Sequence, residues 1–178
     1  LLFGLANLFA DASSMALGNF ISLRSEHDRY QKEREKELHE IKHNTVMEIA
    51  ESRLLLERQG FSKEQSDQLV DIFKTNPEYW ADFMMRYELE IVDLSSDNPF
   101  FTALATFGAF LAFGCIPLLP YLLNIHAANV FIYAIASTGL ALILLGLVRW
   151  KITQQPLYRA VGEVLMLGSI SATIAYFV

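Results

Sequence analysis

The sequence predicts an all-α membrane protein in which a charged helical domain is inserted between membrane-spanning helices. Hydrophobic residues make up 53% of the chain, although 19% of the residues are charged. Of the 34 charged residues, 29 lie between Arg24 and Asp97, where the net charge is −7, and the rest of the chain carries +1. An acidic polar segment argues against nucleic acid as a partner, because nucleic-acid-binding surfaces are basic.

Residues 1–23 contain a single charged side chain, Asp11. A bilayer core of about 30 Å needs about 20 mostly apolar residues, so we expect this segment to form a transmembrane helix. It has neither the Met nor the basic start of a signal peptide. We therefore expect the sequence to be a fragment of a longer protein, with a further helix upstream.

Residues 24–98 are expected to form a helical domain outside the membrane. The stretch from Arg24 to Arg58 is rich in Glu, Lys, Arg and Leu, which favour helix, and Asn44 and Thr45 are a candidate interruption. Gly60 is typical of a helix C-cap. The domain therefore begins with a long helical segment that ends near residue 59.

Two shorter helices follow in the predicted domain. Ser62 and Gln65 form a capping box that predicts a helix over about 63–75, and Asn76-Pro77 starts another over about 78–92. Their apolar positions recur at helical spacing, so we expect the helices to pack as a small bundle with the long helix. These positions are Leu69, Val70, Ile72 and Phe73, then Trp80, Phe83, Met84, Tyr87 and Ile91.

The last part of the chain, residues 99–178, is expected to contain three membrane helices. Residues 100–123 and 127–148 carry no charge, and residues 157–178 form a third apolar run. A turn at residues 95–99 precedes them, and Pro117 and Pro120 should kink or end the first. Basic residues in the 149–159 connection predict that it is cytoplasmic, which places residues 24–98 on the same side.

Two glutamate pairs, Glu37/Glu40 and Glu48/Glu51, are the most informative motif in the charged segment. Members of each pair are three residues apart, and the pairs are eleven residues apart, so all four share a face if the helix is unbroken. Like charges at this spacing repel unless a cation lies between them, and carboxylate oxygens suit hard divalent cations. The alternative is a solvated acidic face that the interleaved lysines and arginines partly neutralise.

Asn7, Asp11 and Met15 share a second face, in the first membrane segment. An ionisable residue inside a membrane span is by default a functional hypothesis, and an amide, a carboxylate and a thioether could pass a transition-metal ion along. The alternative is an Asp11 that is hydrogen-bonded to Ser13, Ser14 or a neighbouring helix, with Met15 as packing.

Three further residues could take part in metal chemistry. Met84 and Glu88 are four residues apart and share a helix face. Glu40 and His43 match the Glu-x-x-His spacing of ferritin-like di-iron proteins, although those proteins need two such motifs. No Walker-type, G-x-G-x-x-G or G-x-S-x-G sequence is present, which argues against an ATP-driven pump within this segment.

These motifs together resemble the vacuolar iron transporter family. The resemblance rests on ADASSMALGNFISLRSEHDRYQKEREKE, the four spaced glutamates, NPEYWADFMMRYELEI and IPLLPYLL, and it covers nearly the whole chain. It implies a homodimeric exchanger of Fe²⁺ (also Mn²⁺, Zn²⁺ or Co²⁺) for protons that moves metal out of the cytoplasm. It also implies five membrane helices per subunit, of which residues 1–23 are the second, with a cytoplasmic domain before the third.

The resemblance also implies roles for individual residues. Met15 matches a methionine of the membrane path, and Asn7 stands where plant members have a glutamate, with Asp11 one turn further on. The family's first helix, with its path aspartate, is absent from the sequence. The residues that match cytoplasmic metal ligands are Glu37, Glu40, Glu48, Glu51, Met84 and Glu88.

Two other functions remain open at this point. A membrane-bound ferroxidase would use Glu40 and His43 and would consume oxygen, whereas a metal sensor would bind metal without flux. The expected location is the cytoplasmic membrane of a bacterium or a vacuolar membrane. Gly168 and Ala172, at small-xxx-small spacing, would permit close contact between helices of two subunits.

Overall fold

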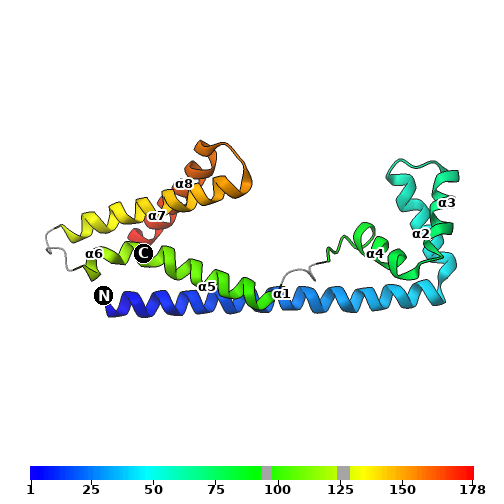
Figure 1. Cartoon of the computed structure of the whole chain (residues 1–178), viewed down its shortest axis with the longest axis horizontal. Coiled ribbons are helices and arrows are strands. Elements are labelled where there is room, and N and C mark those ends of the chain that lie inside the picture. Colours follow the sequence, from blue (N-terminus) through cyan, green and yellow to red (C-terminus); the bar gives the residue numbers. More distant parts are fainter. Residues whose placement is uncertain (94–97, 124–128) are drawn as a thin grey trace. The chain divides into compact units, whose positions relative to one another are not determined.

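The computed structural model describes residues 1–93, 98–123 and 129–178. All regular elements of these residues are helices, and they divide into two compact units, each described separately below (Figure 1). One unit contains Leu1–Gly18 and Ala103–Val178, and the other contains Asn19–Thr102. The helices are α1 (Leu2–His43), α2 (Thr45–Arg58), α3 (Lys63–Phe73), α4 (Pro77–Tyr87), α5 (Pro99–Cys115), η1 (Ile116–Leu118), α6 (Leu119–Leu122), α7 (Val130–Thr153) and α8 (Leu157–Phe177).

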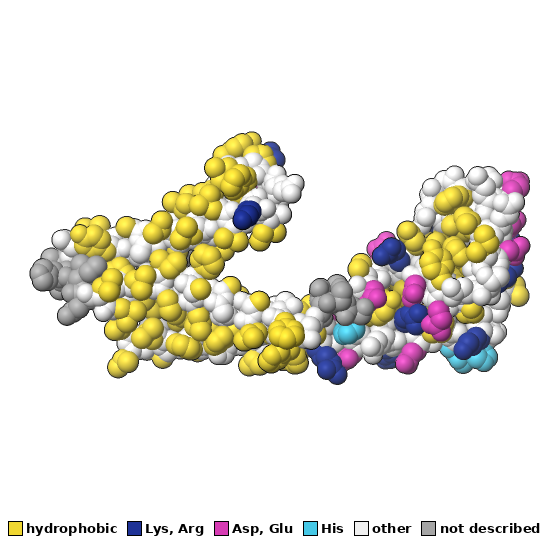
Figure 2. All heavy atoms as spheres, viewed as in Figure 1, with side chains coloured by type: hydrophobic (Ala, Val, Ile, Leu, Met, Phe, Trp, Pro, Cys, Tyr) yellow, Lys and Arg dark blue, Asp and Glu magenta, His cyan; other side chains and the backbone are white. Residues whose placement is uncertain are grey.

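Three helical stretches of the described residues are long and apolar enough to cross a membrane. They are Pro99–Leu122, Val130–Thr153 and Leu157–Phe177, with mean hydropathies of 1.9, 2.3 and 1.5. Hydrophobic side chains cover the visible surface of α5, α7 and α8, whereas charged side chains gather on the unit formed by residues 19–102 (Figure 2). Such apolar exterior surfaces are stable only in lipid, so the protein is an integral membrane protein.

Residues 2–23 are helical, as expected, but they form the start of the 42-residue helix α1. This stretch is not among the three that satisfy the hydropathy criterion. The polar side chains of Asn7, Asp11 and Asn19 lower its mean hydropathy. A membrane position for residues 1–23 therefore stays a prediction.

The prolines interrupt the first apolar stretch as predicted. Helix α5 ends at Cys115, the 3₁₀ helix η1 contains Pro117, and Pro120 lies in the first turn of α6. The loop at residues 124–126, like most of the turn at 95–99, lies outside the described residues.

Helices α7 and α8 pack closely through glycines. A Cβ on Gly146 would lie 2.8 Å from the Cα of Val161, and one on Gly168 would lie 2.5 Å from a side-chain carbon of Leu142. Gly168 therefore serves contact within the chain, and a contact between subunits through Gly168 and Ala172 stays a prediction. Arg149 of α7 also pairs with Glu163 of α8 at 2.5 Å.

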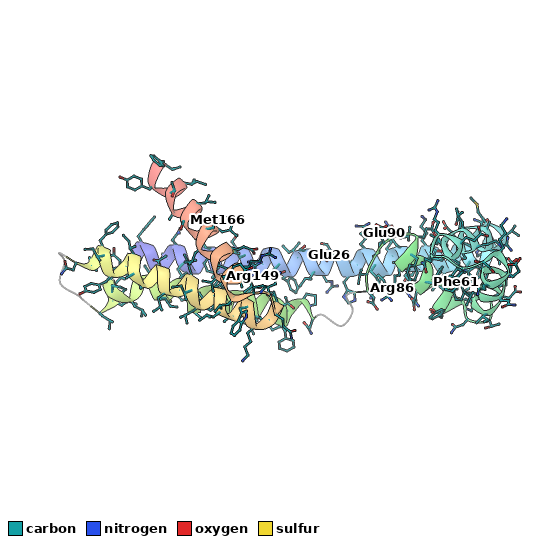
Figure 3. All side chains as sticks on the ribbon, turned by 90° about the horizontal axis from the view of Figure 1, so that it is seen from above. Glu26, Phe61, Arg86, Glu90, Arg149 and Met166 are labelled. Atoms are coloured by element: carbon teal, nitrogen blue, oxygen red, sulfur yellow. The ribbon has the colours of Figure 1, made fainter. Side chains whose placement is uncertain are left out.

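The connection between α7 and α8 is shorter than the predicted 149–159 loop. Helix α7 continues to Thr153, and α8 already begins at Leu157. Gln154, with φ of 54°, ends α7 in a left-handed conformation. Figure 3 shows Arg149 and Met166 on these two helices.

The unit of residues 19–102 contains a core to which helices α1, α2, α3 and α4 contribute. The predicted interruption is present: α1 ends at His43 and α2 begins at Thr45. Gly60 has φ of 100° just after α2, the Ser62–Gln65 capping box is formed, and Asn76 caps α4. The buried cluster consists of Ile41, Leu56, Val70, Phe73, Trp80, Ala81, Phe83 and Met84.

Some details of the predicted bundle are wrong. The helices end at Phe73 and Tyr87 rather than near 75 and 92. The chain turns after α4. The amide of Leu89 donates a hydrogen bond to the carbonyl of Met84, and Glu90 has a positive φ of 54°. Helices α3 and α4 pack against the core on one side only, so Ile72 is 60% exposed and Tyr87 is 45% exposed. Ile91 lies beyond the end of α4.

Candidate metal centre

Three glutamates from three helices converge in the unit of residues 19–102. Glu37 lies on α1, Glu48 lies in the first turn of α2, and Glu88 is the C-cap residue of α4. One carboxylate oxygen of each lies within 4.8 Å of those of the other two. Figure 3 labels Arg86 and Glu90, which flank Glu88 by two residues on either side in the sequence. We call Glu37, Glu48 and Glu88 the carboxylate cluster.

Two members of the carboxylate cluster are removed from water. Glu37 is 4% exposed and Glu48 is 3% exposed, whereas Glu88 is exposed. The Oε1 atom of Glu37 and the Oε2 atom of Glu48 are buried without a hydrogen-bond partner in the structure. Buried carboxylate oxygens without partners are costly. The arrangement therefore suits a group that supplies positive charge, either a proton or a cation.

Burial and mutual repulsion change the acidity of these glutamates. Burial, followed by the hydrogen bond and charge of Glu48, raises the pKa of Glu37 to about 8. Burial also raises the pKa of Glu48 and that of Glu88, with added repulsion from Glu51 in both cases. Each of the first two carboxyls affects the pKa of the other, so they titrate as a pair. At neutral pH Glu37 therefore retains a proton that a cation could displace.

Glu37 and Glu48 do not meet along one unbroken helix; they lie on two helices, α1 and α2. On one straight helix, eleven residues separate Glu37 and Glu48 by about 16 Å of rise. The break at Asn44 instead lets α2 turn back, so that Glu48 reaches Glu37 from another helix. The condition for a shared face, an unbroken helix, is therefore not met, because the interruption expected at Asn44 and Thr45 is present, and Glu37 and Glu48 meet across it.

Two other predicted ligands, Glu40 and Glu51, lie near the carboxylate cluster rather than in it. Glu40 and Glu51 are half-buried and are near enough to raise the pKa of Glu48. Glu40 also lies 3.8 Å from the ammonium of Lys36. Met84 is completely buried.

Ser52 was missed by the sequence analysis, although it contacts a predicted ligand. Its buried hydroxyl donates a hydrogen bond to the sulfur of Met84 at 3.2 Å and accepts one from the indole Nε1 of Trp80 at 2.7 Å. This bridge fixes the sulfur between α2 and α4. Its position four residues after Glu48, on the same helix face, is the signal that could have identified it.

An arginine bridge holds α4 beside α1. The guanidinium of Arg34 lies 2.6 Å from a carboxylate oxygen of Asp82 and 2.8 Å from one of Glu78. Both acids lie on α4, which ends at the cluster residue Glu88. The pairs therefore help to position Glu88, while Arg34 itself is committed to other carboxylates.

The predicted path residues share one face of α1, as expected. The amide of Asn7 donates a hydrogen bond to a carboxylate oxygen of Asp11 at 3.1 Å. The hydroxyl of Ser13 bonds to the carbonyl of Phe9 instead of to Asp11. Met15 is 53% exposed, so it does not serve as packing within the chain.

His43 does not join the carboxylate cluster among the described residues. Its ring stacks on that of His39, with centroids 3.9 Å apart. The di-iron arrangement with Glu40 and a second Glu-x-x-His motif therefore has no counterpart in the geometry of these side chains.

Comparison with known proteins shows the family to which this chain belongs. A sequence model of the VIT family matches residues 1–178. The chain belongs to the VIT family. It is 31% identical over 173 residues to vacuolar iron transporter 1 of Arabidopsis thaliana, covering 97% of this chain and 69% of the relative. The vacuolar iron transporter 1 of Oryza sativa subsp. japonica is 30% identical with the same coverage, and the Toxoplasma gondii vacuolar iron transporter is 29% identical over 99% of this chain and 61% of the relative.

Membership of the VIT family confirms the resemblance that the sequence motifs indicated. The family's members are transporters rather than enzymes, which agrees with the sequence-based prediction of a transporter without catalytic residues. The all-helical architecture with membrane-spanning helices agrees with an integral membrane protein of this family.

Proposed function

We propose that this VIT family protein is a secondary transporter that moves Fe²⁺ or Mn²⁺ out of the cytoplasm in exchange for protons. The single observation that supports this most is the convergence of Glu37, Glu48 and Glu88 within 4.8 Å, with two buried oxygens lacking partners. Divalent cations prefer such oxygen ligands, and the relatives are named iron transporters.

In this proposal the carboxylate cluster captures the ion in the cytoplasm. Carboxylates must lose their protons before they bind metal, so capture releases protons. Glu40 and Glu51 add negative charge that attracts the cation, and the sulfur of Met84 offers a softer ligand to transition metals. Zn²⁺ and Co²⁺ are further substrates that this mixed ligand set would accept.

The ion would then cross the membrane along the face of α1 that carries Asn7, Asp11 and Met15. Asp11 is the one member of this face that can exchange a proton for a metal ion. A second copy of the chain would complete the transporter as a homodimer, and its membrane would be a bacterial cytoplasmic membrane or a vacuolar membrane.

A metal titration of the full chain in detergent tests the capture step. Wild-type protein should bind Mn²⁺ or Fe²⁺ at tens of micromolar or below, and changing all three cluster glutamates to Gln should abolish that site. The matched control changes three exposed glutamates, Glu26, Glu35 and Glu90, to Gln, which alters the net charge equally. Equal loss in both variants would show that only general negative charge matters.

Proteoliposomes that contain a proton-sensitive dye test transport and coupling. Added Fe²⁺ or Mn²⁺ should enter only with proton counter-movement, and Asp11→Asn and Met15→Ala should slow flux while leaving binding at the carboxylate cluster intact. Wild-type flux in both variants would refute the proposed path. Binding without any flux would favour the metal sensor, and Fe²⁺-dependent oxygen consumption would favour the ferroxidase.

A further inference from the structure

Two exposed histidines form a stacked pair on α1, outside the carboxylate cluster. His39 and His43 are four residues apart, and their ring centroids lie 3.9 Å apart with 26° between the ring planes. Both side chains are exposed, and histidine side chains form a visible surface patch on this unit (Figure 2). Residues four apart on a helix present their side chains to the same region of solvent.

The hydrogen bonding of His43 leaves a nitrogen suited to metal. Its Nδ1 lies 2.8 Å from the backbone carbonyl of His39, and a carbonyl can only accept, so Nδ1 carries the hydrogen. The neutral ring then has its lone pair on Nε2, which points away from the helix backbone. Histidines that ligate metals commonly donate the other ring N–H to a carbonyl or carboxylate in this way.

The histidine pair and the carboxylate cluster occupy different faces of α1. At about 100° per residue, His39 lies about 160° and His43 about 120° around the helix from Glu37. One ion therefore cannot be shared by the two groups. Glu35, one turn before His39, is exposed and lies on the same stripe as the histidines.

We propose that His39 and His43 form a second metal site, a two-imidazole chelate for a borderline transition-metal ion such as Zn²⁺ or Cu²⁺. With metal–nitrogen bonds of about 2.0–2.1 Å, the two ligating nitrogens must lie roughly 3.3 Å apart. The stacked rings, whose centroids are 3.9 Å apart, must therefore rotate until both nitrogens face one ion. Imidazole prefers these ions over Mn²⁺ and Mg²⁺, which favour oxygen ligands. The site thus goes beyond the proposed transport function and would take a different class of ion.

Electron paramagnetic resonance of the full chain with one equivalent of Cu²⁺ tests the site. The protein should carry Gln at Glu37, Glu48 and Glu88, so that the carboxylate cluster does not compete for the probe. The expected spectrum shows coupling to two imidazole nitrogens. His39→Gln and His43→Gln should each remove that signature and weaken Cu²⁺ binding at least about tenfold, because the second ligand acts at high effective concentration.

Two further variants separate a chelate from nonspecific histidine binding. His27→Gln, on the same helix, is the matched control and should leave both spectrum and affinity unchanged. His43→Gln combined with Glu35→His rebuilds a pair with the same four-residue spacing one turn earlier, and it should restore the two-nitrogen spectrum. Survival of the wild-type spectrum in His39→Gln, or its loss in His27→Gln, would overturn the proposal, as would failure of the rebuilt pair.

Discussion

Replacing Glu37 by Gln should stabilise the metal-free unit of residues 19–102 at neutral pH. The pKa of Glu37 in the folded protein is raised by burial to about 8 from an ordinary value of 4.5. The folded state therefore binds this proton more tightly than the unfolded chain does. The stabilisation that this proton contributes is fully present below about pH 4.5. It is lost as the pH rises towards 8, which is the sign expected for an acid with a raised pKa.

The magnitude follows from that pKa difference. Each pKa unit corresponds to about 1.4 kcal/mol, so between pH 4.5 and pH 7 the wild-type unit loses about 3 kcal/mol through this proton. Gln resembles the protonated side chain and does not titrate, so Glu37→Gln should avoid the loss. At pH 5 the two proteins should differ by under about 1 kcal/mol.

The two tryptophans of the chain supply the assay. Trp80 is 1% exposed within the unit, and Trp150 lies on α7, so Trp150→Phe leaves one fluorophore that reports unfolding of the unit. Urea titrations in detergent at pH 5 and pH 7 give the midpoints. With a urea dependence of about 1 kcal/mol/M, the midpoint of Glu37→Gln at pH 7 should exceed that of the parent by about 3 M.

Glu35→Gln is the control, because Glu35 is exposed on the same helix and its loss should leave the pH dependence unchanged. Mn²⁺ added to the parent at pH 7 should recover much of the lost stability, since a bound cation offsets the same buried charge. Midpoints of Glu37→Gln and parent within about 0.5 M at pH 7 would refute the argument from buried charge.

Two more substitutions probe packing. Ser52→Ala should lower the free energy of unfolding of the same unit by about 1–3 kcal/mol, because the indole N–H of Trp80 loses its acceptor, and an unchanged urea midpoint would contradict this. Gly146→Ala should destabilise the α7–α8 pair by about 1–3 kcal/mol, because the new Cβ would lie 2.8 Å from the Cα of Val161. Thermal unfolding in detergent should show no such loss for Gly139→Ala, where nothing lies within 4 Å, and equal melting temperatures of the two variants would contradict the packing argument.

Local signals in the sequence predicted most of the helix boundaries. The Ser62–Gln65 capping box, the positive φ at Gly60 and the break near Asn44 depend on a few adjacent residues, and all three are present in the structure. The exposed position of Ile72 was not predictable in this way. Its helix packs on one side only, and the width of the buried stripe is set by partners distant in the sequence.

Helical spacing predicted the residue types of the candidate site, whereas only the resemblance to the family grouped Glu88 with Glu37 and Glu48. Glu37 and Glu48 were recognised by spacing, yet Glu88 joins them from a helix that Arg34 anchors through contacts 44 and 48 residues apart. Helical periodicity contains no information about such long-range contacts. The position of Ser52 on the face of Glu48 could be read from spacing, but its contacts could not, since its partners lie 28 and 32 residues away.

The single non-helical residue between α1 and α2 has a consequence for comparing this protein with its relatives. Asn44 makes no side-chain cap, so its contribution is the change in chain direction itself. A relative that keeps every glutamate but continues the helix through this position would hold Glu37 and Glu48 about 16 Å apart, too far for one ion. Retention of the acidic residues in an alignment is therefore insufficient evidence for a shared binding function. The residue at the bend, whose side chain makes no cap hydrogen bond, is the position to inspect first.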